Sequence, residues 1–283
     1  MTDLKFIIWN FKNGGMKDKL LITLGCSYTE GHGCYDFSIF PIDKNIYDGG
    51  IDVNILNYQK NKFHELGWPN KLGKKLGYNK VLNLGFGGSS TSGNLKWFIQ
   101  KYNDFDFSKY DVLLIWWLPI TYRFSFYNRD LIYNIQTPIK NSDPADYLNE
   151  LSKSYFKFIG DIDGDTIREQ IFYLKLMINF CELKNINFLW YNHDSYTKKY
   201  FKNYPMKYWI GVGDELNNEL YQVNPNYYIN KSCGHPNENG YEIISNYFYN
   251  SIKLNNKHLI NDSNLNYFEW EWDGEPQDYN LEL

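Results

Sequence analysis

The stretch LITLGCSYTEGHG, Leu21 to Gly33, runs from a short apolar segment directly into a glycine-rich turn. A short apolar run bounded by turn residues is typical of a strand buried in a parallel sheet. Ser27 lies in the turn between Gly25 and Gly31, with Cys26 as its neighbour. The turn therefore has three interpretations: a reactive serine, a reactive cysteine, or a tight turn without chemistry.

Other apolar runs have the same form, and each ends in a loop rich in Gly, Ser, Thr, Asn or His. The predicted strands are Lys19 to Leu24, Lys80 to Leu84, Val112 to Trp117 and Asn187 to Tyr191. The predicted helices are Trp68 to Gly77, Asp165 to about Leu183, and Asn237 to about Ile252. Strands that alternate with helices predict an α/β fold with a mostly parallel sheet, in which ligands bind at the carboxyl ends of the strands.

The chain of 283 residues is expected to form one elaborated domain, residues 1–283. The segment from Gly33 to Glu65 has weak periodicity, which predicts a long loop with one short element. Residues 123–164 contain two proline turns and are predicted to be an insertion. Residues 255–283 are acidic and aromatic. They are predicted to form a tail that packs on the body of the protein or contacts a partner. Long loops in compact domains are commonly lids or binding surfaces.

Charge and hydropathy argue against two classes of partner. The formal net charge is −4 and the pI is near 5.8, so nucleic acid is not an expected partner. No apolar run approaches the roughly 20 residues that span a bilayer. The first residues also lack the pattern of a secretory signal. We expect a cytoplasmic or virion-associated protein without a transmembrane segment.

Aromatic residues make up 19% of the chain. Exposed Tyr and Trp often contact carbohydrate or protein, although abundant Lys, Asn, Ile, Tyr and Phe also fit the coding bias of an AT-rich bacterium or its phage. The four cysteines and five histidines have no zinc-type spacing. No metal and no cofactor are therefore expected, and free thiols are favoured over disulfides.

Four loops carry residues that are suited to chemistry: Gly25 to Gly31, Asn83 to Ser90, Leu118 to Arg123, and Cys233 to Tyr241. A serine hydroxyl needs a base to accept its proton, and histidine is the usual base. Backbone N–H groups of a glycine turn can stabilise the oxyanion that forms when an ester is attacked. The chain supplies a serine, a glycine turn and a histidine on loops that a parallel sheet can bring together.

The arrangement Gly25-x-Ser27-x-Thr29, Asn83-x-Gly85-x-x-Gly88-x-Ser90 and His235-Pro-Asn-x-x-Gly240 resembles the SGNH (GDSL) hydrolases. The resemblance implies a flavodoxin-like three-layer α/β/α sandwich with long loop insertions. It also implies the activity of an esterase, a lipase or a carbohydrate O-acetyl esterase. Carried over, Ser27 is the nucleophile and an oxyanion donor through its own N–H, Gly88 gives the second N–H, and His235 is the general base. From the residues alone, Gly88 also fits a simple turn or an anion site at a helix start.

The chain departs from this family after the third strand, where the family has an Asn that donates to the oxyanion. This chain has Leu118, Ile120 and Thr121 in that region. The missing donor costs about 2.7 to 4 kcal/mol of transition-state stabilisation unless it is replaced. The Asn94 side chain and the Thr121 hydroxyl are the two candidate replacements.

A second departure is Ser232, which stands where the family has an Asp before the histidine. The candidates for orienting His235 are the Ser232 hydroxyl, a backbone carbonyl, and a carboxylate from another loop such as Asp194. Cys26 occupies a position where the family usually has Asp, which favours Ser27 over Cys26 as the nucleophile. Arg123 fits either a clamp for a substrate carboxylate or sulfate, or a structural ion pair.

Three functions follow from these patterns. The first is a serine esterase that removes a small acyl group, O-acetyl above all, from a carbohydrate or another small ester substrate. The second is an SGNH-like binding or structural module with weak or no catalysis. The third is an acyltransferase that uses the same residues with a different acceptor.

Overall fold

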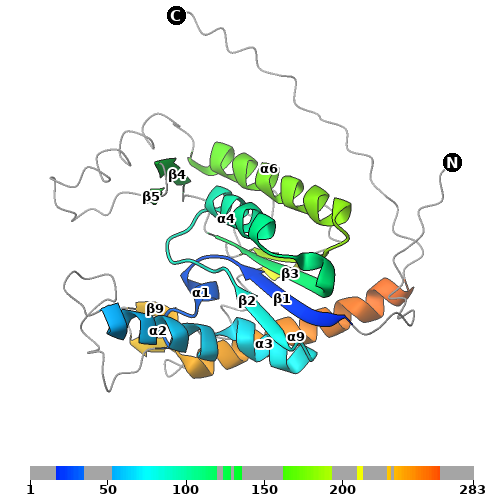
Figure 1. Cartoon of the computed structure of the whole chain (residues 1–283), viewed down its shortest axis with the longest axis horizontal. Helices are drawn as coiled ribbons and strands as arrows, with labels where there is room; N and C mark the ends of the chain where they lie inside the picture. The colour runs from blue at the N-terminus through cyan, green and yellow to red at the C-terminus, as the bar shows by residue number, and fades with distance from the viewer. Residues whose placement is uncertain are drawn as a thin grey trace, which may run out of the picture.

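The structure is a computed structural model, and it describes residues 17–34, 53–119, 124–128, 131–135, 162–192, 209–212, 228–230 and 233–261. Five parallel strands form the central sheet, in the order β2-β1-β3-β6-β7 (Figure 1). Their bounds are β1 Asp18–Leu24, β2 Lys80–Asn83, β3 Tyr110–Leu118, β6 Asn187–Asn192 and β7 Trp209–Val212. The predicted strands lie within one or two residues of β1, β2, β3 and β6, and β7 adds an edge that the sequence pattern did not reveal.

Helices cover both faces of the sheet (Figure 1). One face carries α4 (Thr91–Asp104) and α6 (Ile162–Leu183), and the other carries α2 (Val53–Leu66), α3 (Trp68–Leu76) and α9 (Glu238–Asn261). Alternate residues of each strand serve two cores, because successive side chains of a strand point to opposite faces. Ile22 packs in the core that contains Phe98 of α4, whereas Leu21 packs in the core that contains Trp68 of α3. The fold is therefore the predicted three-layer α/β/α sandwich.

The central strands β1 and β3 are mostly apolar after their first two residues, because both of their faces are covered. From Leu20 to Leu24 every residue of β1 is buried, and the same holds from Val112 to Leu118 of β3. Strands of this kind read as continuous apolar runs instead of alternating ones. This is why the sequence around Ser27 identified its strand so readily.

The remaining described elements are short. They are α1 (Ser27–Glu30), the 3₁₀ helix η1 (Phe107–Lys109), the antiparallel pair β4 (Phe124–Asn128) and β5 (Leu131–Ile135), and the antiparallel pair β8 (Tyr228–Asn230) and β9 (Cys233–Pro236). The β4–β5 hairpin falls within the predicted insertion 123–164, most of which lies outside the described residues. Within the described part of the chain, no helix is both long and apolar enough to cross a membrane.

One predicted loop is wrong in its second part. The segment from Gly33 to Glu65 overlaps α2, a helix of 14 residues that ends at Leu66, where only one short element was expected. Among the described side chains of α2, Phe63 is fully buried, and it packs in the same core as Trp68 of α3. Tertiary packing of this kind stabilises a helix whose sequence has little periodicity.

Two predicted helices extend beyond their expected bounds. Helix α6 begins at Ile162, ahead of Asp165, and α9 continues to Asn261, into the segment 255–283 that was expected to be a tail. The rest of that segment lies outside the described residues. Helix α3 ends as expected at Gly77, which adopts a left-handed conformation with φ 74°.

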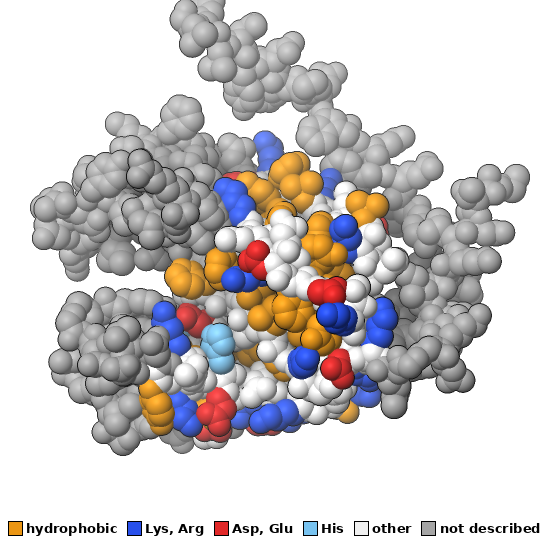
Figure 2. All heavy atoms as spheres, viewed as in Figure 1, with side chains coloured by type: hydrophobic (Ala, Val, Ile, Leu, Met, Phe, Trp, Pro, Cys, Tyr) orange, Lys and Arg blue, Asp and Glu red, His pale blue; other side chains and the backbone are white. Residues whose placement is uncertain are grey.

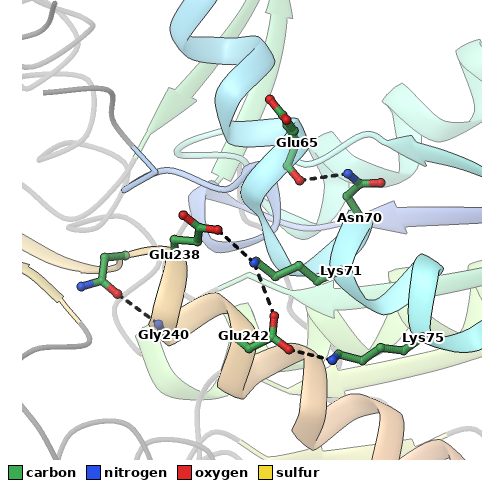
Figure 3. A network of polar contacts seen from close by, with 8 residues as sticks. Glu65, Asn70, Lys71, Lys75, Glu238, Gly240 and Glu242 are labelled. Carbon is green, nitrogen blue, oxygen red and sulfur yellow. Dashed lines mark hydrogen bonds and ion pairs between the residues drawn. The ribbon is translucent and has the colours of Figure 1, made fainter. Parts of the chain in front are cut away.

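Ion pairs join α3 to α9 (Figure 3). Lys71 Nζ lies 3.4 Å from a carboxylate oxygen of Glu238 and 3.4 Å from one of Glu242, and Lys75 Nζ lies 2.6 Å from the other oxygen of Glu242. The carboxylates are about half exposed, so each pair contributes little to stability on its own. Their position is more informative than their energy. They join α3 to α9, the helix that follows directly after the strand that carries His235.

On the face shown in Figure 2, basic and acidic side chains are interspersed among apolar ones over the described residues. Several large apolar side chains are exposed, including Phe86 in the loop after β2 and Phe172 on α6. Scattered exposed apolar residues are normal on a protein surface. Phe86 is the one that lies in a loop of the predicted site.

Candidate active site

Ser27 is the first residue of α1, directly after the turn that ends β1. The turn is tight, because a Cβ added at Gly25 would collide with the Thr29 side chain. Gly31 closes α1 in a left-handed conformation, φ 96°, and its N–H bonds to the carbonyl of Ser27. The sequence therefore folds as strand, turn and a single helical turn, which presents Ser27 at the carboxyl end of the sheet.

His235 lies on β9, immediately before α9. Its Nε2 is 2.8 Å from Ser27 Oγ, although 208 residues separate the two in the chain. Asn237 caps α9 by accepting the N–H of Gly240 at 3.1 Å, which ends the strand and starts the helix beside His235. The structure thus brings together the two residues that the sequence predicted as nucleophile and base.

The loop after β2 is fastened to the serine turn through one carbonyl oxygen. Gly25 O accepts the N–H of Phe86 at 3.1 Å, the hydroxyl of Ser89 at 2.9 Å and an N–H of the Asn94 side chain at 3.2 Å. Three donors on one oxygen leave the turn little freedom to change shape. The predicted nucleophile loop and the predicted glycine loop are therefore one connected structure.

Two further side chains hold the same loops together. Asn83 donates to Thr29 O at 2.8 Å and accepts the N–H of Gly85 at 2.9 Å. The buried carboxylate of Glu30 accepts the N–H of Gly87 at 2.8 Å. At Gly85 a Cβ would collide with the backbone of Glu30, so only glycine allows the two loops to approach this closely.

Gly88 is the predicted second oxyanion donor. It has φ 77°, and no acceptor in the described part of the chain receives its N–H. The same holds, among the described residues, for the N–H of Ser27, which begins α1 and so has no partner inside the helix. Neither predicted backbone donor is therefore bound to another described residue, and their oxyanion role stays a prediction.

Asn94 does not fit its predicted role. Its side-chain N–H groups are donated to Gly25 O and to Ser89 Oγ, the latter at 2.9 Å, and its oxygen accepts the indole N–H of Trp116 at 3.0 Å. The side chain is buried and has no N–H left for an oxyanion. Asn94 is instead part of the structure that holds the serine turn.

Four other predicted residues, Thr121, Arg123, Asp194 and Ser232, lie outside the described residues. Their roles as oxyanion donor, substrate clamp and orienting groups stay predictions.

The structure places one more residue, His32, at the predicted site. The sequence showed only that this histidine has no metal-type spacing. The ring of His32 stacks on the ring of His235, with centroids 4.4 Å apart and planes 20° apart. Burial, together with the nearby His235, lowers the pKa of His32 to about 3, so this ring is neutral at neutral pH. The one feature of the sequence that could have pointed to His32 is its place in the glycine-rich stretch that contains Ser27.

The cysteines are poor candidates for chemistry. Cys26, Cys34 and Cys181 are free thiols with buried side chains, and burial raises the pKa of Cys34 to about 12. Cys26 is 1% exposed and packs inward while the next residue faces His235. Among the described residues, no three His, Cys, Asp or Glu side chains gather to form a metal site.

No family model and no curated protein matches this sequence. Solved structures similar to it include a G-D-S-L family protein from Desulfitobacterium hafniense DCB-2, with 13% identity over 83% of this chain and 99% of that one, TM-score 0.44. The esterase EstA from Pseudoalteromonas sp. has 12% identity over 86% of this chain and 100% of that one, TM-score 0.44. A family two carbohydrate esterase from Cellvibrio japonicus has 11% identity over 87% of this chain and 64% of that one, TM-score 0.44.

Proposed function

We propose that this protein is a serine esterase that removes a small acyl group, the O-acetyl group of a carbohydrate above all. The observation that carries the proposal is the 2.8 Å contact between His235 Nε2 and Ser27 Oγ. That distance is within the range in which a base accepts the proton of a nucleophile. The free N–H groups of Ser27 and Gly88 supply the second requirement, donors for an oxyanion.

The reaction follows from this geometry in two halves. Ser27 Oγ attacks the acyl carbonyl while His235 Nε2 takes the hydroxyl proton, and the carbonyl oxygen becomes an oxyanion near the two N–H groups. The C–O bond to the alcohol then breaks, and His235 gives its proton to the departing oxygen. In the second half, water loses a proton to His235 and attacks the acyl-serine. The acid is released and Ser27 Oγ recovers its proton.

The proposed substrate class rests on the surroundings of the site. Phe86 lies between Gly85 and Gly87 in the loop that carries Gly88, and the residue is 44% exposed. An exposed aromatic ring offers a flat apolar surface on which a sugar ring can pack. The high content of Tyr and Trp in the chain is consistent with the same class.

Hydrolysis of p-nitrophenyl acetate and of an acetylated glycan tests this proposal. We expect Ser27→Ala to abolish hydrolysis of both substrates, and a fluorophosphonate to label the wild-type protein but not this variant. Ser108→Ala is a matched control, because Ser108 is an exposed serine on η1 with a bond to Asp106. Unchanged activity of Ser27→Ala would show that the esterase proposal is wrong.

A binding role without catalysis is the second candidate. It is favoured by Asn94, because its N–H groups are already donated to Gly25 and Ser89 and cannot replace the side-chain donor of the family pattern. An inert wild-type protein that still binds an acetylated glycan in calorimetry would support this role. An acyltransferase would be recognised by transfer of the acetyl group to an added alcohol in preference to water.

A further inference from the structure

The ring of His32 forms a platform for the proposed base. Its plane lies 20° from the plane of His235, and the ring centroids are 4.4 Å apart. The ring of Phe63 also stacks on His32, with centroids 5.4 Å apart and planes 19° apart. The rings of His235 and Phe63 therefore both stack on the ring of His32, and the three residues come from separate parts of the chain.

The backbone of His32 is fixed to the nucleophile. Its N–H donates to the carbonyl of Ser27 at 3.0 Å, and the N–H of Gly31 donates to the same oxygen. Tyr241, a fully buried residue of α9, donates its hydroxyl to the carbonyl of His32 at 2.8 Å. Because α9 follows directly after His235, this bond ties the platform to the chain segment that carries the base.

We propose that His32 is a positioning residue, whose ring holds the plane of His235 so that Nε2 faces Ser27 Oγ. In the family that the motifs resemble, an Asp before the histidine orients the base, and this chain has Ser232 there. The inference rests on the proposed function of Ser27 and His235. It assigns the ring a steric and stacking role and needs no hydrogen bond between the two histidines.

The neutral state of His32 suits this role. In the proposed reaction His235 becomes positively charged when it takes the proton of Ser27. A second cation stacked on that ring would oppose the transfer, whereas a neutral ring offers its π face to the cation. The burial of His32, 7% exposed, keeps the ring neutral and keeps it away from the substrate.

Two variants distinguish a role of the His32 ring from a role of its hydrogen-bonding atoms. His32→Phe keeps a flat ring and loses both nitrogens, while His32→Gln keeps polar atoms and loses the ring. We expect His32→Gln to lower kcat for p-nitrophenyl acetate about 10- to 100-fold, since a small misplacement of a catalytic group costs that much. KM should stay within about threefold because His32 does not face the substrate, and His32→Phe should restore kcat by about tenfold relative to His32→Gln.

Crystal structures of the two variants provide a readout that does not depend on activity. Nε2 of His235 should stay within about 3.2 Å of Ser27 Oγ in His32→Phe and move beyond it in His32→Gln. If wild-type protein hydrolyses no ester, the proposed function fails, and the structures still show whether the ring positions His235. If His32→Gln does not fold, His32→Leu takes its place, with the same expected result.

Three results would overturn the positioning role. In the first, His32→Gln has wild-type kcat and keeps the contact to Ser27. In the second, the order is reversed, with Gln active and Phe inactive, which would indicate a hydrogen-bonding role. In the third, kcat is lost equally in both variants.

Discussion

The Nε2 atom of His235 lies 2.8 Å from the Oγ atom of Ser27, at the carboxyl end of a parallel sheet. If the pair works as a unit, removing either member should cost nearly as much as removing both. We expect His235→Ala and Ser27→Ala each to lower kcat/KM at least about 1,000-fold, and the double variant to be no worse than the poorer single variant. Steady-state hydrolysis of p-nitrophenyl acetate measures this, and costs that add in the double variant would contradict a shared step.

Asn94 should be needed for stability more than for chemistry. Asn94→Ala removes the N–H that reaches Gly25 O and leaves the indole N–H of Trp116 without its acceptor. We expect the free energy of unfolding in urea to fall by about 2 to 4 kcal/mol. Asn70→Ala is the matched control, since Asn70 makes one exposed bond to a backbone oxygen and should cost less than about 1 kcal/mol.

The opposite result for Asn94 would restore its predicted role. A variant with unchanged stability and a kcat about 100-fold lower would indicate a direct contact with the oxyanion.

The carboxylate of Glu30 should hold the glycine loop in place. Glu30→Ala leaves the N–H of Gly87 without its acceptor in a buried place, so we expect a loss of about 1.5 to 3 kcal/mol in the free energy of unfolding and a lower kcat. Glu30→Gln keeps an acceptor oxygen and should lose less on both measures. Glu65→Ala serves as the control because Glu65 is exposed and pairs only locally with Lys62. Equal effects of Glu30→Ala and Glu65→Ala would contradict the bracing role.

The buried His32 should make the protein less stable in mild acid. Burial, and to a smaller extent His235, lowers the pKa of His32 from the ordinary value of 6.5 to about 3. Between these two pH values the unfolded chain binds a proton that the folded chain does not, so the free energy of unfolding falls as the pH falls through this window. The contribution approaches about 1.4 kcal/mol per pH unit.

Urea unfolding of wild type and His32→Phe at about pH 7, 6 and 5 measures this contribution. The stability of the wild type relative to the variant should fall as the pH falls, because the phenylalanine binds no proton. A constant difference across this range would contradict the buried, neutral state of His32.

The two central strands were the clearest prediction from the sequence. β1 and β3 are buried on both faces, so their apolar runs and the loops that follow them were recognisable, and Ser27 with them. Helix α2 was not, because its described residues show no clear apolar period, and Phe63 is held by Trp68 and its neighbours in the core. Such contacts between residues far apart in the chain depend on tertiary packing, which a local sequence pattern does not reveal.

The site shows the same division. Ser27, Gly88 and His235 were predicted as site residues from the order of motifs along the chain, whereas the contacts of Asn94 and His32 depend on which atoms meet in space. An amide in a loop near the site has the right chemistry for an oxyanion, and only the contacts to Gly25 and Trp116 show that its N–H groups are already used. Likewise, a histidine in the serine turn becomes informative only when a ring from the other end of the chain stacks on it.

The three donors on the carbonyl of Gly25 have a consequence for how this protein can be altered. Substitutions around Phe86, chosen to admit a different sugar, would also shift the Gly25 peptide unit, which precedes Ser27 in the same turn. Their effects on substrate selectivity and on the rate of the proposed reaction would then not add. We therefore expect a library that varies the loop from Phe86 to Ser89 jointly with the turn from Gly25 to Ser27 to recover more active variants than one that varies either segment alone.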